Sequence, residues 1–198
     1  MAPVKVDPAK VHEFPTAASF YRWLGKQHDK ADEVWIKIHK VDSGLKSITP
    51  KDAIDVVLCW GWIDGLRKGL DGKSYLQRYS PRGRKSVWSQ INVDNVARLI
   101  GEGRMTAHGL AQVDAAKADG RWARAYRSKD SKIPDDLRAA IDAEPKARAM
   151  LEKLSAQNRF ALTFRVGNMK TEAGRKRKIA TFVAMLKRGE TIHPQGKK

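Results

Sequence analysis

Two spacings of apolar residues organise the first part of the chain. Residues 16–28 place their large apolar side chains on one face at helical spacing, and Thr16 precedes them as a helix cap. Residues 33–40 alternate between aliphatic side chains and Trp, Lys or His, which is typical of a half-buried strand. The sequence Thr-Pro-Lys-Asp at 49–52 then predicts the start of a second helix, because Thr caps a helix well and Pro fits its first turn.

A β-hairpin is predicted directly after the second helix. Residues 61–66 and 74–79 have strand-like composition, and the Asp71-Gly72 pair between them is a favoured two-residue turn. Together with the strand at 33–40, they predict a small antiparallel sheet that carries the two helices.

From Ser89 onward the apolar spacing is helical throughout. Pro145 divides the helical stretch 139–154 into two helices, because proline disrupts a helix interior. The last helix carries apolar residues at i, i+3, i+4 and i+7 and ends before Gly189, and Gly174 is expected to weaken its first turn.

These patterns predict an α+β protein in two parts. Residues 1–127 form the α+β region with the small antiparallel sheet, and residues 128–198 form an all-helical module that begins in the polar stretch 128–132. A chain of 198 residues can bury roughly 70% of its unfolded surface, so its core needs no metal or disulfide. The single cysteine excludes an intramolecular disulfide and any zinc site with several cysteines.

The sequence also bears on where the protein acts. No apolar run approaches the roughly 18 residues of a membrane span, so no membrane span is predicted. The N-terminus lacks the apolar segment of a signal peptide, and we therefore expect a cytoplasmic protein.

The formal net charge is +17, and its excess is unevenly distributed. Residues 1–66 hold nine basic and nine acidic residues, whereas residues 67–198 hold 30 basic and 13 acidic residues. A one-sided positive field concentrates anions such as nucleic acid or phosphorylated metabolites, and the alternative is that the charge only keeps the protein soluble. The basic run 175–178 has the same two interpretations, contact with phosphates or a solvated helix face.

The most unusual segment is Cys-Trp-Gly-Trp-Ile-Asp-Gly at 59–65. If it is a strand, Trp60, Trp62 and Asp64 point to one face and could line a ligand pocket. The alternative is that both tryptophans belong to the core and that Asp64 forms a structural ion pair with Arg78.

A second unusual segment, 79–92, crowds the sequence Arg-Gly-Arg-Lys into a turn before a helix. Guanidinium groups that converge with the N–H donors of a helix start are a common way to build an anion site. Downstream, Gly103-Arg-Met105 and Gly120-Arg-Trp122 repeat the pairing of a basic residue with a large apolar one. The predicted ligand-binding residues are Trp60, Trp62, Asp64, Arg78, Arg82, Ser86, Trp88, Asn92, Arg104 and Trp122.

Catalytic and metal sites have weaker support. Asp64 as a general acid or base needs a second titratable group within reach, and the candidates His39 and His108 lie on separate elements. Cys59 ends an apolar helical stripe, which indicates a buried and unreactive thiol. No metal-ligand spacing is present, and we predict no metal and no cofactor.

Seven stretches of the chain together have a recognisable pattern: FPTAASFYRWL at 14–24, VWIKIHK at 34–40, CWGWIDG at 59–65, YSPRGRKSVWSQIN at 79–92, LIGEGRMTAHGLAQVDAAKADGRW at 99–122, IPDDLRAAIDAEPKARAMLEKLS at 133–155 and GRKRKIATFVAMLKRG at 174–189. In the order and spacing of these stretches, over residues 14–189, the chain resembles the YdeI/OmpD-associated family, also called bacteriocin-protection proteins. The resemblance implies an α+β region followed by a helical module, and it implies no catalytic chemistry. Protection against cationic bacteriocins would have to be indirect, because a protein of charge +17 repels them.

Three functions remain open from the sequence. The favoured one is a non-catalytic stress or protection protein that binds an anionic small molecule or a partner protein segment in the central pocket. The second is a nucleic-acid-associated protein that uses the basic residues of 67–198. The third is a small-molecule enzyme that uses Asp64.

Overall fold

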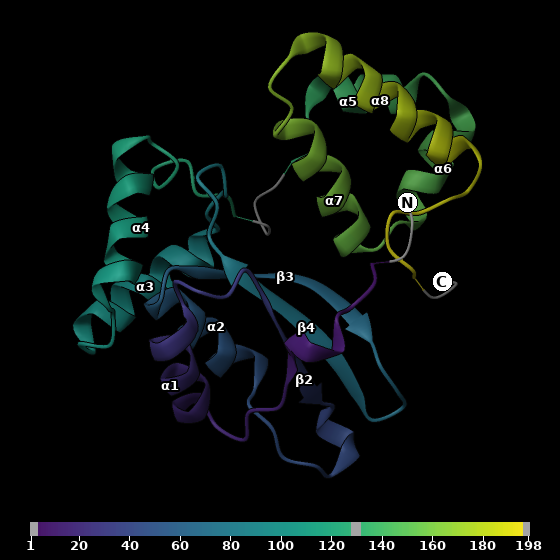
Figure 1. Ribbon diagram of the computed structural model, residues 1–198. Coiled ribbons are helices and arrows are strands. Elements are labelled where there is room, and N and C mark those ends of the chain that lie inside the picture. Colours follow the sequence, from purple (N-terminus) through teal and green to yellow (C-terminus); the bar gives the residue numbers. More distant parts are fainter. Residues whose placement is uncertain (1–3, 128–131, 196–198) are drawn as a thin grey trace. The chain divides into compact units, whose positions relative to one another are not determined.

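The computed structural model describes residues 4–127 and 132–195, and the chain divides into two compact units, Met1–Tyr126 and Arg127–Lys198 (Figure 1). Residues 128–131 of the polar stretch predicted to join two regions lie outside the described residues. The predicted order, an α+β region followed by helices, is confirmed. Within residues 4–127 and 132–195, no helix combines the length and apolarity that crossing a bilayer requires.

The described residues of the first unit form four α-helices and one four-stranded sheet. Its elements are η1 (Pro8–Lys10), β1 (Val11–His12), α1 (Ala17–Gln27), β2 (Val34–His39), η2 (Val41–Ser43), α2 (Pro50–Cys59), β3 (Trp62–Gly69), β4 (Ser74–Pro81), α3 (Gln90–Gly101) and α4 (Ala107–Ala118). The predicted caps are confirmed: the Thr16 hydroxyl accepts from the Ser19 amide at 3.2 Å, and that of Thr49 accepts from the Asp52 amide at 3.1 Å.

The sheet has the order β1-β2-β4-β3. The two predicted hairpin strands pair antiparallel, and β2 pairs antiparallel with β4, as expected. The predicted sheet was purely antiparallel, whereas the observed sheet also contains the two-residue strand β1, which pairs in parallel with β2. A strand of two residues is too short to show an alternating pattern, so the sequence did not reveal it.

Two apolar clusters hold the first unit together. One joins α1 and α2 to one face of the sheet, through Phe20, Leu24, Val57, Ile36 and other buried side chains. The other lies among α2, α3 and α4 and includes Cys59, Trp88, Val96, Leu99 and Val113. Because α2 contributes to both clusters, it connects the sheet layer to the α3–α4 pair.

A sharp reversal separates α2 from β3. Trp60 is the C-cap residue of α2, and Gly61 has a φ of 71°, a left-handed conformation that favours glycine. A Cβ at Gly61 would lie 2.9 Å from the carbonyl oxygen of His108. The strand begins only at Trp62, so the predicted alternation of Trp60 with Trp62 on one strand face is wrong.

The second unit is all helical, as predicted. It contains α5 (Asp135–Asp142), α6 (Pro145–Lys153), α7 (Ala156–Gly167) and α8 (Glu172–Lys187). Pro145 stands at the start of α6, which confirms that it divides the helical stretch. The core residues are Leu137, Ile141, Ala147, Leu151, Leu154, Leu162, Val166, Phe182 and Leu186.

Gly174 has a different role from the one its helix propensity suggests. It lies buried in the first turn of α8, and its amide donates to the Thr171 hydroxyl at 3.1 Å. A Cβ there would lie 2.8 Å from that hydroxyl oxygen and 3.0 Å from Met169 Cε. The expected weakness of this turn is offset by a cap that fits closely because residue 174 is glycine.

Candidate functional site

Two basic segments of the first unit run side by side. The Tyr126 amide donates to the Trp88 carbonyl at 3.0 Å, and the Gln90 amide donates to the Tyr126 carbonyl at 2.8 Å. Arg121 Nη1 also donates to the Ser86 carbonyl at 3.0 Å. We call residues 82–89 and 117–126 together the basic patch.

Local sequence features give the patch its shape. Pro81 ends β4, and the Arg82 amide then donates to the Gly61 carbonyl at 3.0 Å. Ser89 caps α3, so the first segment ends where that helix begins. Gly120, with a φ of 75°, ends α4 and turns the chain back toward the first segment.

Arg82 is the buried basic residue of the patch, with only 5% of its surface exposed. Its guanidinium carbon is 3.7 Å from the centre of the Trp88 ring, a cation–π contact, and Nη1 donates to the Val87 carbonyl at 3.1 Å. Its Nε and Nη2 are buried without a hydrogen-bond partner among the described residues. Unsatisfied buried donors of a charged group are costly, so this side chain stands out in the unit.

The charge of Arg82 is only partly compensated. Burial lowers the pKa of Arg82 to about 10, while the Asp64 carboxylate raises it and Arg121 lowers it further. Arg82 therefore stays protonated at pH 7. Asp64 is exposed on β3 and is absent from the ion pairs between described residues, so it influences Arg82 without contacting it.

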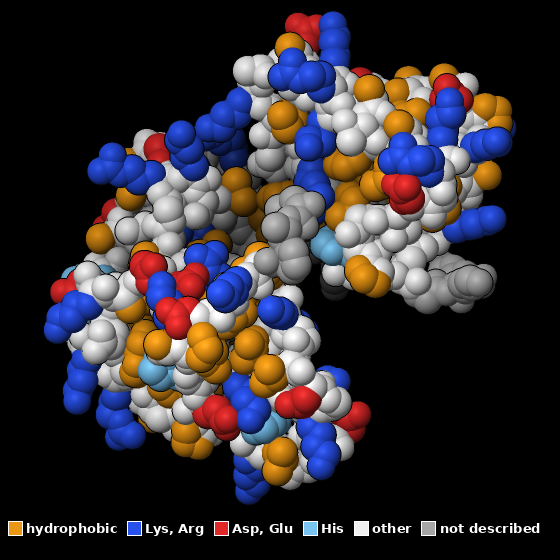
Figure 2. All heavy atoms as spheres, turned by 45° about the vertical axis from the view of Figure 1, so that its right-hand side comes forward, with side chains coloured by type: hydrophobic (Ala, Val, Ile, Leu, Met, Phe, Trp, Pro, Cys, Tyr) orange, Lys and Arg blue, Asp and Glu red, His pale blue; other side chains and the backbone are white. Residues whose placement is uncertain are grey.

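More cations surround this buried one. The patch contains six basic residues and one acidic residue, Asp119, which pairs with Arg121 at 2.7 Å. Arg84 and Lys85 are exposed, and neither side chain has a polar partner within residues 4–127 or 132–195. Arg124 donates only to the backbone carbonyls of Gly120 and Asp119. Basic side chains also exceed acidic ones over the face of the molecule drawn in Figure 2.

The structure brings four of the ten predicted ligand-binding residues together. Arg82, Ser86 and Trp88 lie on the first segment of the patch, and Trp122 on the second meets Trp88 edge to face at a centroid distance of 4.9 Å. Asn92 is close in sequence, in the first turn of α3, where its amide donates to the Ser89 hydroxyl.

The remaining predicted residues lie elsewhere. Trp62 is 1% exposed in the core, and its Nε1 donates to the His28 carbonyl at 3.2 Å. Trp60 packs against His28 at a centroid distance of 4.7 Å. Arg78 pairs with Glu33, so the alternative ion pair between Asp64 and Arg78 is wrong. Arg104 belongs to a separate pocket near α1.

The possible partners of Asp64 in catalysis are occupied with other groups. His39 Nε2 lies 3.8 Å from Glu13 Oε2, and the ring of His108 lies 3.9 Å from that of His28. Cys59 is fully buried, as predicted, and burial raises the pKa of its thiol to about 11. In the described part of the chain, no three His, Cys, Asp or Glu side chains are grouped as metal ligands.

In the basic run 175–178, two residues form ion pairs and two form none with the residues that the structure describes. Arg175 donates to both carboxylate oxygens of Asp136, at 2.6 and 2.8 Å, and Lys176 pairs with Glu172 at 2.7 Å. Lys178 lies 5.8 Å from the centre of the Phe182 ring. Two of the four charges are thus neutralised within the second unit.

Five basic residues of the patch are absent from the predicted ligand-binding residues. Two of them, Arg84 and Lys85, lie in the basic turn that the sequence singled out, and the other three are Lys117, Arg121 and Arg124 on the second segment. The signal that could have found these three is the Gly-Arg-Trp sequence at 120–122, which repeats the pairing of a basic with a large apolar residue. The proximity of this segment to residues 82–89 depends on tertiary contacts that sequence patterns do not reveal.

Two family models match the chain. Residues 130–189 match the model described as "Bacteriocin-protection, YdeI or OmpD-Associated", which confirms the predicted family for the helical module. Residues 12–112 match a separate model described as "Domain of unknown function (DUF8412)". No curated protein and no solved structure matches the chain.

Proposed function

Since the chain belongs to the DUF8412 family over residues 12–112 and carries a YdeI- or OmpD-associated module at 130–189, we propose that it is a non-catalytic cytoplasmic binding protein whose basic patch takes a small phosphate-bearing ligand. Neither family description supplies a ligand. The proposal therefore depends on the chemistry of the patch alone.

The observation that carries the proposal is the state of Arg82. Its positive charge lies in the protein interior, stacked on Trp88. Among residues 4–127 and 132–195, two of its donors have no hydrogen-bond partner and no carboxylate pairs with it. A buried charge is screened by salt less than a surface charge, so it raises the potential of the patch above it. An anion bound over the patch would compensate this charge.

The exposed cations supply the direct contacts. Arg84 and Lys85 have no ion pair with any of the residues that the structure describes, so binding an anion breaks none of those contacts. Arg124 is held by two backbone carbonyls, which fixes its guanidinium while leaving its charge without a carboxylate. A phosphate, with its several acceptor oxygens, suits several basic donors on two adjacent segments.

The experiment is calorimetric titration of the full chain with inorganic pyrophosphate, at 20 mM and 150 mM salt. The test variant is the double substitution Arg84→Gln with Lys85→Gln, and the control is Lys26→Gln with Lys30→Gln, which removes the same charge from exposed residues near the end of α1. We expect the test variant to bind at least tenfold more weakly and the control to bind within about twofold of the unaltered chain. Equal weakening by both variants, or no binding at low salt, would overturn the proposal.

Two further measurements test the other two functions, nucleic-acid association and catalysis. A short single-stranded DNA that binds more tightly than pyrophosphate, with a steep salt dependence, would favour the nucleic-acid-associated function. Turnover of a phosphate ester that Asp64→Asn abolishes without weakening binding would favour an enzyme.

A further inference from the structure

A cavity of the first unit lies apart from the basic patch. It has a volume of about 490 Å³ and lies between α1, α2 and the connection from α3 to α4. The volume is within the range of sites that take small organic molecules. None of its lining residues belongs to residues 82–89 or 117–126.

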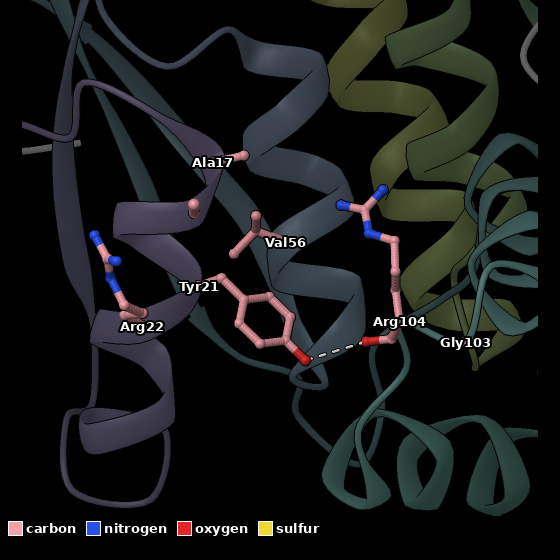
Figure 3. A pocket seen from close by; sticks show the side chains of 7 residues that line it. Ala17, Tyr21, Arg22, Val56, Gly103 and Arg104 are labelled. Carbon is pink, nitrogen blue, oxygen red and sulfur yellow. Dashed lines mark hydrogen bonds between the residues drawn. The ribbon is translucent and has the colours of Figure 1, made fainter.

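The walls of this cavity are largely apolar. Ala17 and Ala18 contribute small side chains from α1, and Val56 contributes an isopropyl group from α2. The Tyr21 hydroxyl donates to the Arg104 carbonyl at 3.2 Å, which fixes the phenol ring. Figure 3 shows this ring turned toward Arg104, while the Arg22 guanidinium is directed away from the ring.

The charges around the cavity leave a positive excess. Arg98 pairs with Asp55 and Glu102, and Arg104 Nη1 donates to Glu102 at 3.0 Å and lies 3.9 Å from Asp55, so these four charges cancel. Arg22 is exposed on α1 and has no polar partner in the described part of the chain. Its charge is therefore available to a ligand.

We propose that this cavity binds a monocarboxylate with a compact apolar body. The exposed Arg22 side chain, which is directed away from the Tyr21 ring in Figure 3, would turn toward the cavity to meet the carboxylate. The Tyr21 ring with its aliphatic neighbours would cover the apolar body. The single uncompensated guanidinium, that of Arg22, matches a ligand with one negative charge. The apolar walls disfavour a ligand with several charged groups. This site is independent of the proposed function of the basic patch.

The probe is benzoate, compared with neutral benzamide and cationic benzylamine, followed by amide shifts in ¹H–¹⁵N NMR spectra of the full chain. We expect benzoate to shift the amides of Ala17, Ala18 and Gly103, benzamide to bind at least fivefold more weakly, and benzylamine to leave these amides unmoved. Equal binding of benzoate and benzamide would overturn the assignment of a carboxylate.

Two substitutions locate the binding site. Ala18→Leu places a larger side chain against the cavity at an exposed helical position and should abolish benzoate binding. Arg22→Gln should weaken it about tenfold, whereas the control Lys26→Gln, on the same helix but away from the cavity, should leave it unchanged. Benzoate binding that is indifferent to both substitutions would overturn the proposal. Pyrophosphate binding should be the same in all three variants, so a failure here is distinguishable from a failure of the basic patch.

Discussion

Arg98 Nη2 on α3 donates to both carboxylate oxygens of Asp55 on α2, at 2.6 and 2.7 Å. Asp55 is only 6% exposed, so Arg98 is the principal compensation of a buried negative charge. Replacing Arg98 by Ala should therefore lower the free energy of unfolding by about 2 kcal/mol, the typical cost of losing hydrogen bonds to a charged group. Urea denaturation followed by circular dichroism measures this loss.

The matched control is Glu102→Gln, which removes the other ion pair of Arg98. Both side chains of that pair are 39% exposed, and exposed pairs contribute little to stability. The urea midpoint of this variant should stay close to that of the unaltered chain. If Arg98→Ala and Glu102→Gln lowered the free energy of unfolding equally, the burial of Asp55 would not explain the effect of Arg98→Ala.

A second prediction concerns Gly109, where α4 approaches the end of α2. A Cβ at this position would lie 2.3 Å from the Cys59 carbonyl oxygen and 2.9 Å from that of Leu58, and backbone atoms cannot move aside easily. Gly109→Ala should destabilise the first unit by about 2 kcal/mol, since it overpacks a buried contact. Thermal unfolding of the variant tests this expectation.

Gly101 provides the opposite case for comparison. It is exposed at the end of α3, and nothing lies within 4 Å of a Cβ built there. Gly101→Ala should therefore raise stability by up to about 1 kcal/mol, because alanine favours the helix and restricts the unfolded chain. A loss of stability at Gly101, or none at Gly109, would contradict the steric argument.

Local features of the fold could be predicted from the sequence because neighbouring residues determine them. Thr16 and Thr49 cap helices through contacts three residues away. The predicted hairpin is present, but residues 70–73 join its strands in a loop longer than the predicted two-residue turn at Asp71-Gly72. The reversal at Gly61 could not be predicted, since it depends on the approach of α4 at His108. The same approach moves Trp60 away from the strand that contains Trp62.

The candidate site shows the same division between local and distant contacts. The sequence identified Arg82 and Trp88 because a basic turn precedes a helix there. It did not identify Arg121, whose contact with the Ser86 carbonyl joins residues 35 positions apart. Nor did it indicate that Arg78 would pair with Glu33, because that contact depends on how β2 pairs with β4. Asp64 therefore forms no ion pair with another described residue.

Cys59 should be unreactive in the folded protein. Its side chain is fully buried, and burial raises the pKa of the thiol to about 11, so the nucleophilic thiolate is scarce at pH 8. The reagent DTNB should modify Cys59 at least a hundredfold more slowly in buffer than in 8 M urea. As the pH rises from 8 toward 11, the rate in buffer should increase, because the thiolate fraction increases. Rapid modification at pH 8 in buffer would show that the α2–α4 contact opens readily.

The last prediction concerns the independence of the two units. The core of the second unit, with Leu137, Ile141, Leu151 and Phe182, shares no residue with the two clusters of the first. Fragments 1–126 and 127–198 should therefore each fold alone, since each retains a complete core. Their ¹H–¹⁵N NMR spectra should be well dispersed and should overlay on the full chain's spectrum for residues away from the cut. A collapsed spectrum for 127–198 would mean that its four helices depend on the first unit, and the amides that differ most between fragment and full chain would then identify where that dependence lies.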